Sequence, residues 1–191
     1  MILYGSYTSP YVRHIRTALL QFNFTFEFVD TDYTASASGS PLKRVPFLDT
    51  GDKKLTDSSS ILLYLKQLSG QSGFDNLDDF ELYALVNSAM DTEINLFLLS
   101  RDGLTPDNSD YLSRQKSRVA SSLGYMNDLI ANQTVDINGL SDGQLRLACF
   151  LDWGLFRQRF SLDGLDSLTA FLEGVRVIEE FAATKPPVWA P

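Results

Sequence analysis

The stretch ILYGSYTSPYVRHIRTALLQFNFTFEFV, residues 2–29, decides the first part of the fold. Ile2-Leu3-Tyr4 is typical of a short buried strand, and Gly5-Ser6 is typical of the turn that ends it. Apolar residues then recur at helical spacing over residues 10–22 and alternate over residues 24–29. This order of strand, helix and strand predicts a right-handed β-α-β unit with parallel strands.

The next segment predicts an antiparallel hairpin followed by a helix. Residues 31–40 are poor in large apolar side chains, and we expect a loop there that holds at most a short irregular helix. Residues 46–49 and 53–56 are predicted strands joined by a tight turn. Asp57 or Ser58 caps the helix that follows. A β-α-β unit followed by β-β-α is the order of a thioredoxin-like α/β domain.

The rest of the chain is predicted to be an all-helical bundle. Because residues 69–73 are small, polar and without periodicity, we assign residues 1–68 to the thioredoxin-like domain, 69–76 to a linker and 77–191 to the helical domain. Helical spacing of apolar residues predicts helices at 77–100, 111–131, 141–159, 165–172 and 175–183. The third of these opens with a capping box of Ser141 and Gln144.

Composition narrows the class of protein. The chain has 191 residues, 44% of them hydrophobic, with no apolar run of the ~18–20 residues that a membrane span requires. Its start lacks the positively charged segment of a signal peptide. The single cysteine, Cys149, cannot form an intrachain disulfide. We therefore expect a cytoplasmic globular protein without membrane association.

The net charge of −8 is unevenly distributed. Residues 1–74 contain seven basic and six acidic residues, a net charge of +1, and the remainder contains nine basic and eighteen acidic residues, a net charge of −9. Such an acidic chain repels phosphate backbones, so we expect no nucleic-acid partner. The nearly neutral first part is better suited to a small anionic ligand.

Ser9-Pro10 starts the first predicted helix and is the first of three candidate ligand-binding motifs. A helix N-terminus carries free amide groups and a partial positive charge, which favours an anion and lowers the pKa of a nearby thiol. The Ser9 hydroxyl could donate a hydrogen bond to that sulfur. Since the only cysteine, Cys149, lies far along the chain, the thiol must belong to a ligand, which argues against a thiol–disulfide oxidoreductase.

Two further motifs follow in the same domain. Val45-Pro46 enters a strand, and proline is tolerated at the first residue of a strand. Asp57 can pair with an ammonium group, while the helix start at Ser58 can bind a carboxylate. Arg44 adds a cation beside this strand, unless it is only a solvated loop charge. Together these motifs indicate a pocket for a small, anionic, thiol-bearing peptide.

The chain resembles glutathione transferases over nearly its whole length, and these three motifs carry the resemblance. Residues 5–13, GSYTSPYVR, resemble the start of bacterial glutathione transferase-like proteins, and residues 57–61 resemble the family's Glu-Ser-x-x-Ile. Residues 40–46, SPLKRVP, resemble Asn-Pro-x-Gly-Lys-Val-Pro. The departures include Lys43 in place of Gly and Asp57 in place of Glu.

The resemblance implies which hydroxyl activates the glutathione sulfur. In serine-type members this is the Ser directly before Pro, which corresponds here to Ser9. Thr8 is an alternative if the turn is shifted by one residue. Tyr4 is another, because it matches the position at the end of a strand where tyrosine-type members keep their catalytic hydroxyl.

The resemblance also implies how the rest of glutathione is bound. The proline before the third strand is cis in thioredoxin-like proteins, and it turns the main chain of the preceding residue, here Val45, towards the cysteinyl group. Arg44 would bind the glycine carboxylate. Asp57 and Ser58 would hold the γ-glutamyl group.

The implied function is that of a homodimeric glutathione transferase in detoxification, with glutathione as co-substrate and no metal. Its thiolate would attack a small hydrophobic electrophile. The alternatives are a non-catalytic binding or scaffold protein of the same fold, and a glutathione-dependent isomerase or dehalogenase.

A second-substrate pocket is expected between Tyr7, Tyr11, Asn95 and Leu98, with Trp189 either closing over it or packing elsewhere. His14, the only histidine, is expected at a solvated position of the first helix.

Overall fold

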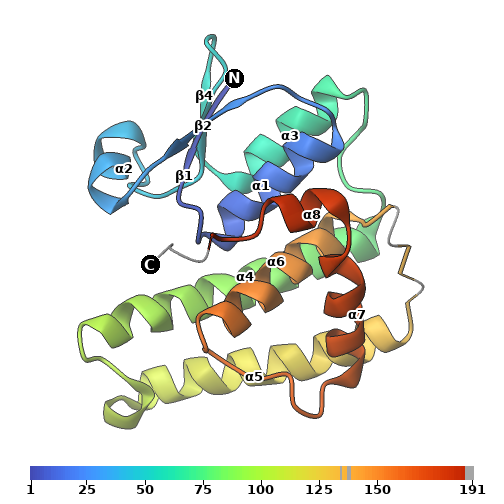
Figure 1. Ribbon diagram of the computed structural model, residues 1–191. Coiled ribbons are helices and arrows are strands. Elements are labelled where there is room, and N and C mark those ends of the chain that lie inside the picture. Colours follow the sequence, from blue (N-terminus) through green and yellow to red (C-terminus); the bar gives the residue numbers. More distant parts are fainter. Residues whose placement is uncertain (134, 137–138, 188–191) are drawn as a thin grey trace. The chain divides into compact units, whose positions relative to one another are not determined.

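The computed structural model describes residues 1–133, 135–136 and 139–187, and these form two compact units (Figure 1). One unit comprises Met1–Asp75 together with the described residues after Arg176, and the other comprises Asn76–Arg176. The structure therefore divides the chain differently from the sequence-based assignment, which placed the C-terminal residues in the helical domain. The reason is that residues 177–187 pack within the first unit.

The first unit is built around a four-stranded sheet in the order β2-β1-β3-β4. Strand β1 pairs parallel with β2 and antiparallel with β3, and β3 pairs antiparallel with β4. The bounds are β1 Ile2–Gly5, α1 Pro10–Gln21, β2 Glu27–Asp30, α2 Tyr33–Gly39, β3 Phe47–Asp49, β4 Lys54–Leu55, α3 Ser58–Leu68 and α8 Glu179–Ala183. This arrangement confirms the predicted thioredoxin-like order.

Helices α1 and α3 lie on one face of the sheet and α2 lies on the other (Figure 1). Leu3 and Leu48, which are opposite each other in β1 and β3, are fully buried. Tyr4 and Phe47 project from the other face, because successive side chains of a strand alternate. A Cβ atom on Gly39 would lie 2.4 Å from the Phe47 ring, so α2 packs directly on that face.

The close approach of β1 to α1 depends on a glycine. A Cβ atom on Gly5 would lie only 2.5 Å from the side chain of Val12 in α1. Any larger residue would push the start of α1 away from the end of β1. Gly5 therefore sets where the loop between these two elements begins.

Two local predictions differ from the structure. Strand β2 starts at Glu27, three residues later than the alternation of apolar residues indicated. Residues 33–39 form a regular helix, α2, where a loop or a short irregular helix was expected. Asp32 caps α2 by accepting a 2.7 Å hydrogen bond from the amide of Ala35. The small side chains of α2 give no apolar periodicity, so its cap was the only local signal.

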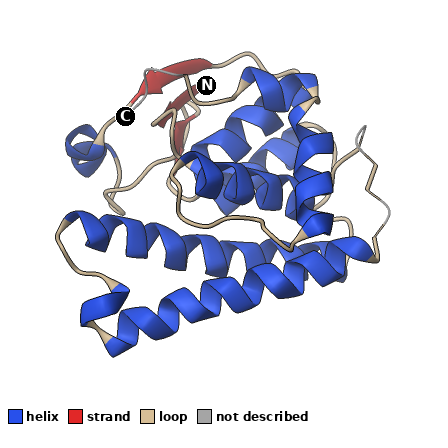
Figure 2. Ribbon diagram, turned by 60° about the horizontal axis from the view of Figure 1, so that its bottom comes forward, coloured by secondary structure: helices blue, strands red, loops and turns tan. Residues whose placement is uncertain are grey.

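The second unit contains helices and a short 3₁₀ turn. Its elements are α4 Leu77–Arg101, η1 Pro106–Asn108, α5 Asp110–Ala131, α6 Asp142–Phe156 and α7 Asp166–Arg176. Figures 1 and 2 show α4 and α5 as two long antiparallel helices that lie side by side, as predicted. All residues of α6 from Asp142 to Gly154 are buried, including Cys149, so α6 is the central helix of this unit.

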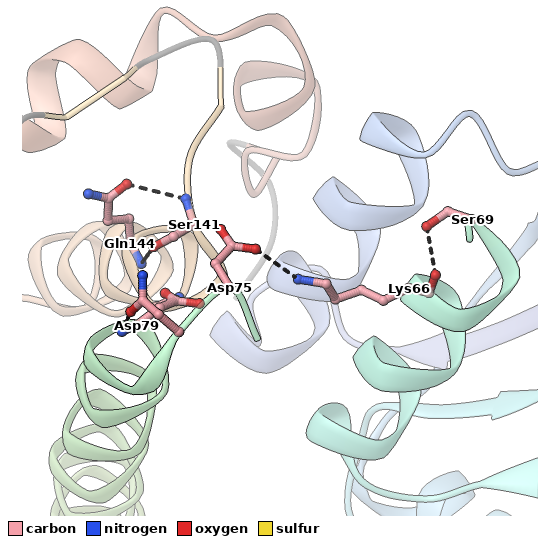
Figure 3. A network of polar contacts seen from close by, with 8 residues as sticks. Lys66, Ser69, Asp75, Asp79, Ser141 and Gln144 are labelled. Atoms are coloured by element: carbon pink, nitrogen blue, oxygen red, sulfur yellow. Dashed lines mark hydrogen bonds and ion pairs between the residues drawn. The ribbon is translucent and has the colours of Figure 1, made fainter. Parts of the chain in front are cut away.

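The predicted capping box at the start of α6 is present (Figure 3). The Ser141 hydroxyl accepts from the amide of Gln144, and the Gln144 side chain accepts from the amide of Ser141. The amide of Gly143 donates a 2.7 Å hydrogen bond to the carboxylate of Asp79 in α4, which ties α6 to α4. These bonds satisfy amide groups that the first turn of a helix leaves without helical partners.

Polar contacts also hold the C-terminal end of α3 in the first unit. The ammonium group of Lys66, which is nearly buried, lies 3.9 Å from the carboxylate of Asp75, and the Ser69 hydroxyl donates to the Lys66 carbonyl (Figure 3).

Along the described chain, no helix is both long and apolar enough to cross a membrane.

Candidate functional site

The topology of the first unit brings three chain segments to one edge of the sheet. Strands β1 and β3 are antiparallel, so the end of β1 and the start of β3 lie at the same edge, with Tyr4 opposite Phe47. Strand β4 is antiparallel to β3, and therefore it too ends at that edge. The loop before α1, the residues before β3 and the start of α3 are thus neighbours in space. These segments contain Ser9, Val45 and Asp57.

Ser9 is the N-cap residue of α1, as the sequence predicted. Its backbone is extended, Pro10 occupies the first helical position, and its hydroxyl oxygen accepts a 3.3 Å hydrogen bond from the amide of Val12. The amide of Ser9 donates to the carbonyl of Ser6 over 3.1 Å, which closes a turn after β1. Accepting the cap bond uses an oxygen lone pair, so the hydroxyl hydrogen can still be donated to an anion.

The two alternative hydroxyl groups are placed differently. The Thr8 hydroxyl lies 3.2 Å from the hydroxyl of Ser6 within the turn. The Tyr4 ring stacks on Phe47, with ring centroids 4.5 Å apart and an interplanar angle of 11°. Of the three residues, Ser9 is the one whose hydroxyl sits at a helix N-terminus. The role of Ser9 in stabilising a bound thiolate stays a prediction.

Asp57 caps α3 and remains exposed. One of its carboxylate oxygens, Oδ1, accepts hydrogen bonds from the amides of Ser59 at 2.8 Å and Ser60 at 3.4 Å. Its other oxygen, Oδ2, lies outside these bonds. Ser58, the first residue of the helix, is buried. The start of α3 thus combines an accessible carboxylate with a helix N-terminus, which suits a ligand that carries both an ammonium and a carboxylate group.

The loop before β3 is fixed by two buried serines, Ser40, which stands where the resembling motif has Asn, and Ser36, which the sequence analysis did not single out. The Ser40 carbonyl accepts from the amide of Lys43 over 2.9 Å, and the Ser36 hydroxyl donates to the Lys43 carbonyl over 3.3 Å. Beyond this turn, Arg44 is exposed and the Val45–Pro46 peptide is cis, as the resemblance implied. No pattern in the local sequence identifies Ser36, because its partner lies outside its own helix.

Lys43 adopts the left-handed backbone conformation, with φ = +51°. This is the position at which the resembling motif has glycine, the residue that adopts such a φ without steric cost. Lys43 therefore adopts at this position a backbone conformation that favours glycine. The departure from the motif is local, and the side chains of Lys43 and Arg44 remain exposed beside the main chain of Val45.

The four residues predicted for a second-substrate pocket are divided between the two units. Tyr7 and Tyr11 belong to the first unit, and Asn95 and Leu98 belong to α4 in the second. The Asn95 side chain is exposed and donates a 2.8 Å hydrogen bond to the carbonyl of Asp91. This pocket stays a prediction, and Trp189 lies outside the described residues.

The prediction of a solvated His14 was wrong, since this side chain is fully buried. Helix α1 packs against α3 and also against α8. More of its surface is therefore buried than a single apolar stripe predicts.

Among the described residues, no group of three His, Cys, Asp or Glu side chains could hold a metal ion.

The chain is similar to known proteins in sequence. Residues 3–73 match the family model described as glutathione S-transferase, N-terminal domain. A relative from Escherichia coli (strain K12), described as an uncharacterized GST-like protein, YibF, is 28% identical over 98% of this chain and 99% of its own length.

Solved structures share the fold of the whole chain. A glutathione S-transferase from Methylobacillus flagellatus, crystallised with glutathione bound, superposes with a TM-score of 0.85 at 21% identity, covering 97% of this chain and 99% of that one. A maleyl pyruvate isomerase, described as a bacterial glutathione S-transferase in the Zeta class, gives a TM-score of 0.80 at 17% identity, with 97% of both chains covered.

Proposed function

We propose that this chain, whose residues 3–73 match the glutathione S-transferase N-terminal domain, is a glutathione transferase in which the thiolate of bound glutathione attacks a small hydrophobic electrophile. The observation that carries this proposal is the position of Ser9, whose hydroxyl caps α1 at the sheet edge where the three candidate motifs meet.

Ser9 and the start of α1 would act together on the thiol. The partial positive charge of a helix N-terminus stabilises a thiolate relative to the thiol, and a hydroxyl donor adds a hydrogen bond to the charged sulfur. A hydrogen bond to a charged group contributes about 1.5–3 kcal/mol. Glutathione would thus be bound largely as the thiolate at neutral pH, which is the nucleophile that the reaction requires.

The remaining groups of glutathione would be bound by the other two segments. The exposed guanidinium group of Arg44 would bind the glycine carboxylate, and the main chain of Val45 would pair with the cysteinyl residue. At the start of α3, Asp57 would bind the γ-glutamyl ammonium group. The amides of the first turn, at Ser58, would bind the γ-glutamyl carboxylate.

The second substrate is proposed to be a small apolar electrophile that contacts Tyr7, Tyr11, Asn95 and Leu98. We also propose a cytoplasmic homodimer with a role in detoxification, as the family resemblance implies. An isomerase that uses glutathione is the second candidate, because a similar structure is described as a maleyl pyruvate isomerase. It would use the same glutathione site. A scaffold protein without catalysis is the third.

Calorimetric titration with reduced glutathione tests the shared site. We expect both the wild-type protein and Ser9→Ala to bind glutathione, and only the wild-type protein to conjugate it rapidly to aromatic halides or isothiocyanates. Thr8→Val is the matched control, because it removes a neighbouring hydroxyl and should leave turnover unchanged.

The outcomes separate the candidate functions. Binding without conjugation, but with cis–trans isomerisation of maleyl-type substrates, would replace the transferase proposal by an isomerase. Failure of the wild-type protein to bind millimolar glutathione would leave a transferase fold used as a scaffold.

A further inference from the structure

The C-terminal segment of the chain is a structural part of the unit that contains Ser9. Helix α8 packs against α1 within this unit (Figure 1). Arg13 of α1 donates a 3.1 Å hydrogen bond to the carbonyl of Phe181, and its guanidinium group lies 3.8 Å from the centroid of the Phe181 ring. The Thr17 and Thr184 hydroxyl groups lie 2.9 Å apart, and this contact is buried.

Arg16 connects this segment to the loop before α1. Its Nη1 donates a 3.2 Å hydrogen bond to the carbonyl of Thr184 at the end of α8. The same guanidinium group lies 5.0 Å from the centroid of the Tyr7 ring and 4.9 Å from that of Phe28 in β2. Cations at such distances from aromatic faces are attracted to them. Burial lowers the pKa of Arg16, but an arginine side chain stays protonated at neutral pH.

Tyr7 lies inside the turn that positions Ser9. The amide of Ser9 donates to the carbonyl of Ser6, so Tyr7 is one of the two residues that this hydrogen bond encloses. The Tyr7 ring packs edge-on against Phe28 at a centroid distance of 4.8 Å. The Tyr7 ring therefore contacts both Phe28 of β2 and Arg16. A displacement of the Tyr7 side chain would change the turn and move the Ser9 hydroxyl relative to the start of α1.

We propose that Arg16 is a positioning residue for the thiol site, through which the carbonyl end of α8 holds the Ser6–Ser9 turn in the conformation that aims the Ser9 hydroxyl at the ligand sulfur. The inference rests on the proposed glutathione-binding function. Arg16 itself does not contact the ligand in this proposal. Its guanidinium group suits the role because it can donate to Thr184 while it lies 5.0 Å and 4.9 Å from the centroids of two aromatic rings.

The test is the pKa of the glutathione thiol in the binary complex, measured from the ultraviolet absorbance of the thiolate as a function of pH. We expect Arg16→Met to raise this pKa by about 1, towards the value of about 8.5 of a free cysteine thiol. The Kd for glutathione at neutral pH should change less than threefold, because the contacts to its carboxylates are kept. Arg16→Lys should restore the pKa only in part, because one ammonium group cannot make all three contacts.

A double-mutant cycle shows whether Arg16 acts through Tyr7. Tyr7→Leu should raise the thiol pKa as Arg16→Met does, and the double variant should raise it no further. Thr17→Val is the matched structural control. It removes the buried hydrogen bond to Thr184 and should lower the melting temperature without changing the thiol pKa.

Each result decides the proposal. An unchanged thiol pKa in Arg16→Met, with glutathione still bound, would overturn the role of Arg16 and leave the proposed function intact. Additive effects of Arg16→Met and Tyr7→Leu would also overturn it, since Arg16 would then act by its charge alone. If the wild-type protein binds no glutathione, both this proposal and the proposed function fail.

Discussion

The main-chain amide of Lys43 donates a hydrogen bond to the carbonyl of Ser40, and this 2.9 Å contact closes a turn in which Lys43 has φ = +51°. The carbonyl of Lys43 is held as well, by the hydroxyl of Ser36. A left-handed conformation costs an L-residue about 1–2 kcal/mol, because its Cβ atom approaches the following carbonyl oxygen. The loop beside Val45 therefore contains local strain that the two serines maintain.

Lys43→Gly should stabilise the protein. Relief of the strain outweighs the larger backbone entropy of glycine in the unfolded chain, for a net gain of about 0.5–1 kcal/mol. Urea denaturation would measure this gain. Lys43→Ala is the control, because it keeps the Cβ atom and loses only the charged side chain. Equal free energies of unfolding for the Gly and Ala variants would show that Lys43 is not strained.

Ser9→Ala should lower turnover with glutathione by about 10–150-fold, because the hydrogen bond to a charged sulfur contributes about 1.5–3 kcal/mol in the transition state. The affinity for glutathione should change much less. The substitution also removes a helix cap, which costs about 1 kcal/mol of stability. Steady-state kinetics and urea denaturation of the same samples would separate the two effects.

Ser109→Ala is the control for the lost cap. Ser109 caps α5 in the same way, by accepting a hydrogen bond from the amide of Leu112. We expect a similar loss of stability and no loss of turnover. If Ser109→Ala also slowed turnover, the effect of Ser9→Ala would be attributable to destabilisation.

Asp57→Asn should weaken glutathione binding without destabilising the protein. Asparagine caps a helix as well as aspartate does, so the bonds to the amides of Ser59 and Ser60 can persist. The neutral side chain loses the attraction to an ammonium group, which at an exposed site contributes up to about 1 kcal/mol, or about fivefold in Kd. Calorimetry would measure this loss. Asp57→Ala should lower both affinity and stability.

Titration of Glu93 in α4 should make the helical unit less stable as the pH rises. Burial raises the pKa of Glu93, although the hydrogen bond and the charge of Arg159, at 2.8 Å, oppose the shift. The folded protein therefore binds this proton more tightly than the unfolded chain does. The resulting stabilisation is complete below the pKa of about 4.3 of an unfolded glutamate, and it is lost as the pH rises through the higher folded value.

The free energies of unfolding of wild type and Glu93→Gln, compared at several pH values, test this expectation. The difference, wild type minus variant, should decrease from about pH 4 towards neutral pH. Glu173→Gln, which makes the same change at an exposed position of α7, is the matched control variant. A difference that increases with pH would mean that the ion pair with Arg159 outweighs the cost of burial.

Much of the fold could be predicted because its signals are local. The helix starts at Ser9, Asp57 and Ser141 are visible as capping residues, and the structure has a cap bond at each. The long helices α4 and α5 have apolar residues at helical spacing, and their observed bounds differ from the predicted ones by one residue at most. The short helix α2 lacks such spacing, and it was expected to be a loop or a short irregular helix.

The candidate site was predictable only as a set of segments. The order Ser9, Val45, Asp57 could be predicted from the motifs, and the pairing of β1, β3 and β4 places these segments at one edge. The support of the site could not be predicted. Ser36 holds the Lys43 carbonyl from another element, and Arg16 contacts both Tyr7 and the end of α8.

The sequence by itself determined the elements and the order in which they follow one another, because hydrophobic period and capping chemistry act over only a few residues. Only the tertiary structure decided that the C-terminal segment joins the first unit, where Phe181 accepts from Arg13 across 168 residues of chain. It also decided that His14 is buried and that Lys43 is strained. The physical reason is that such contacts depend on which surfaces meet after folding.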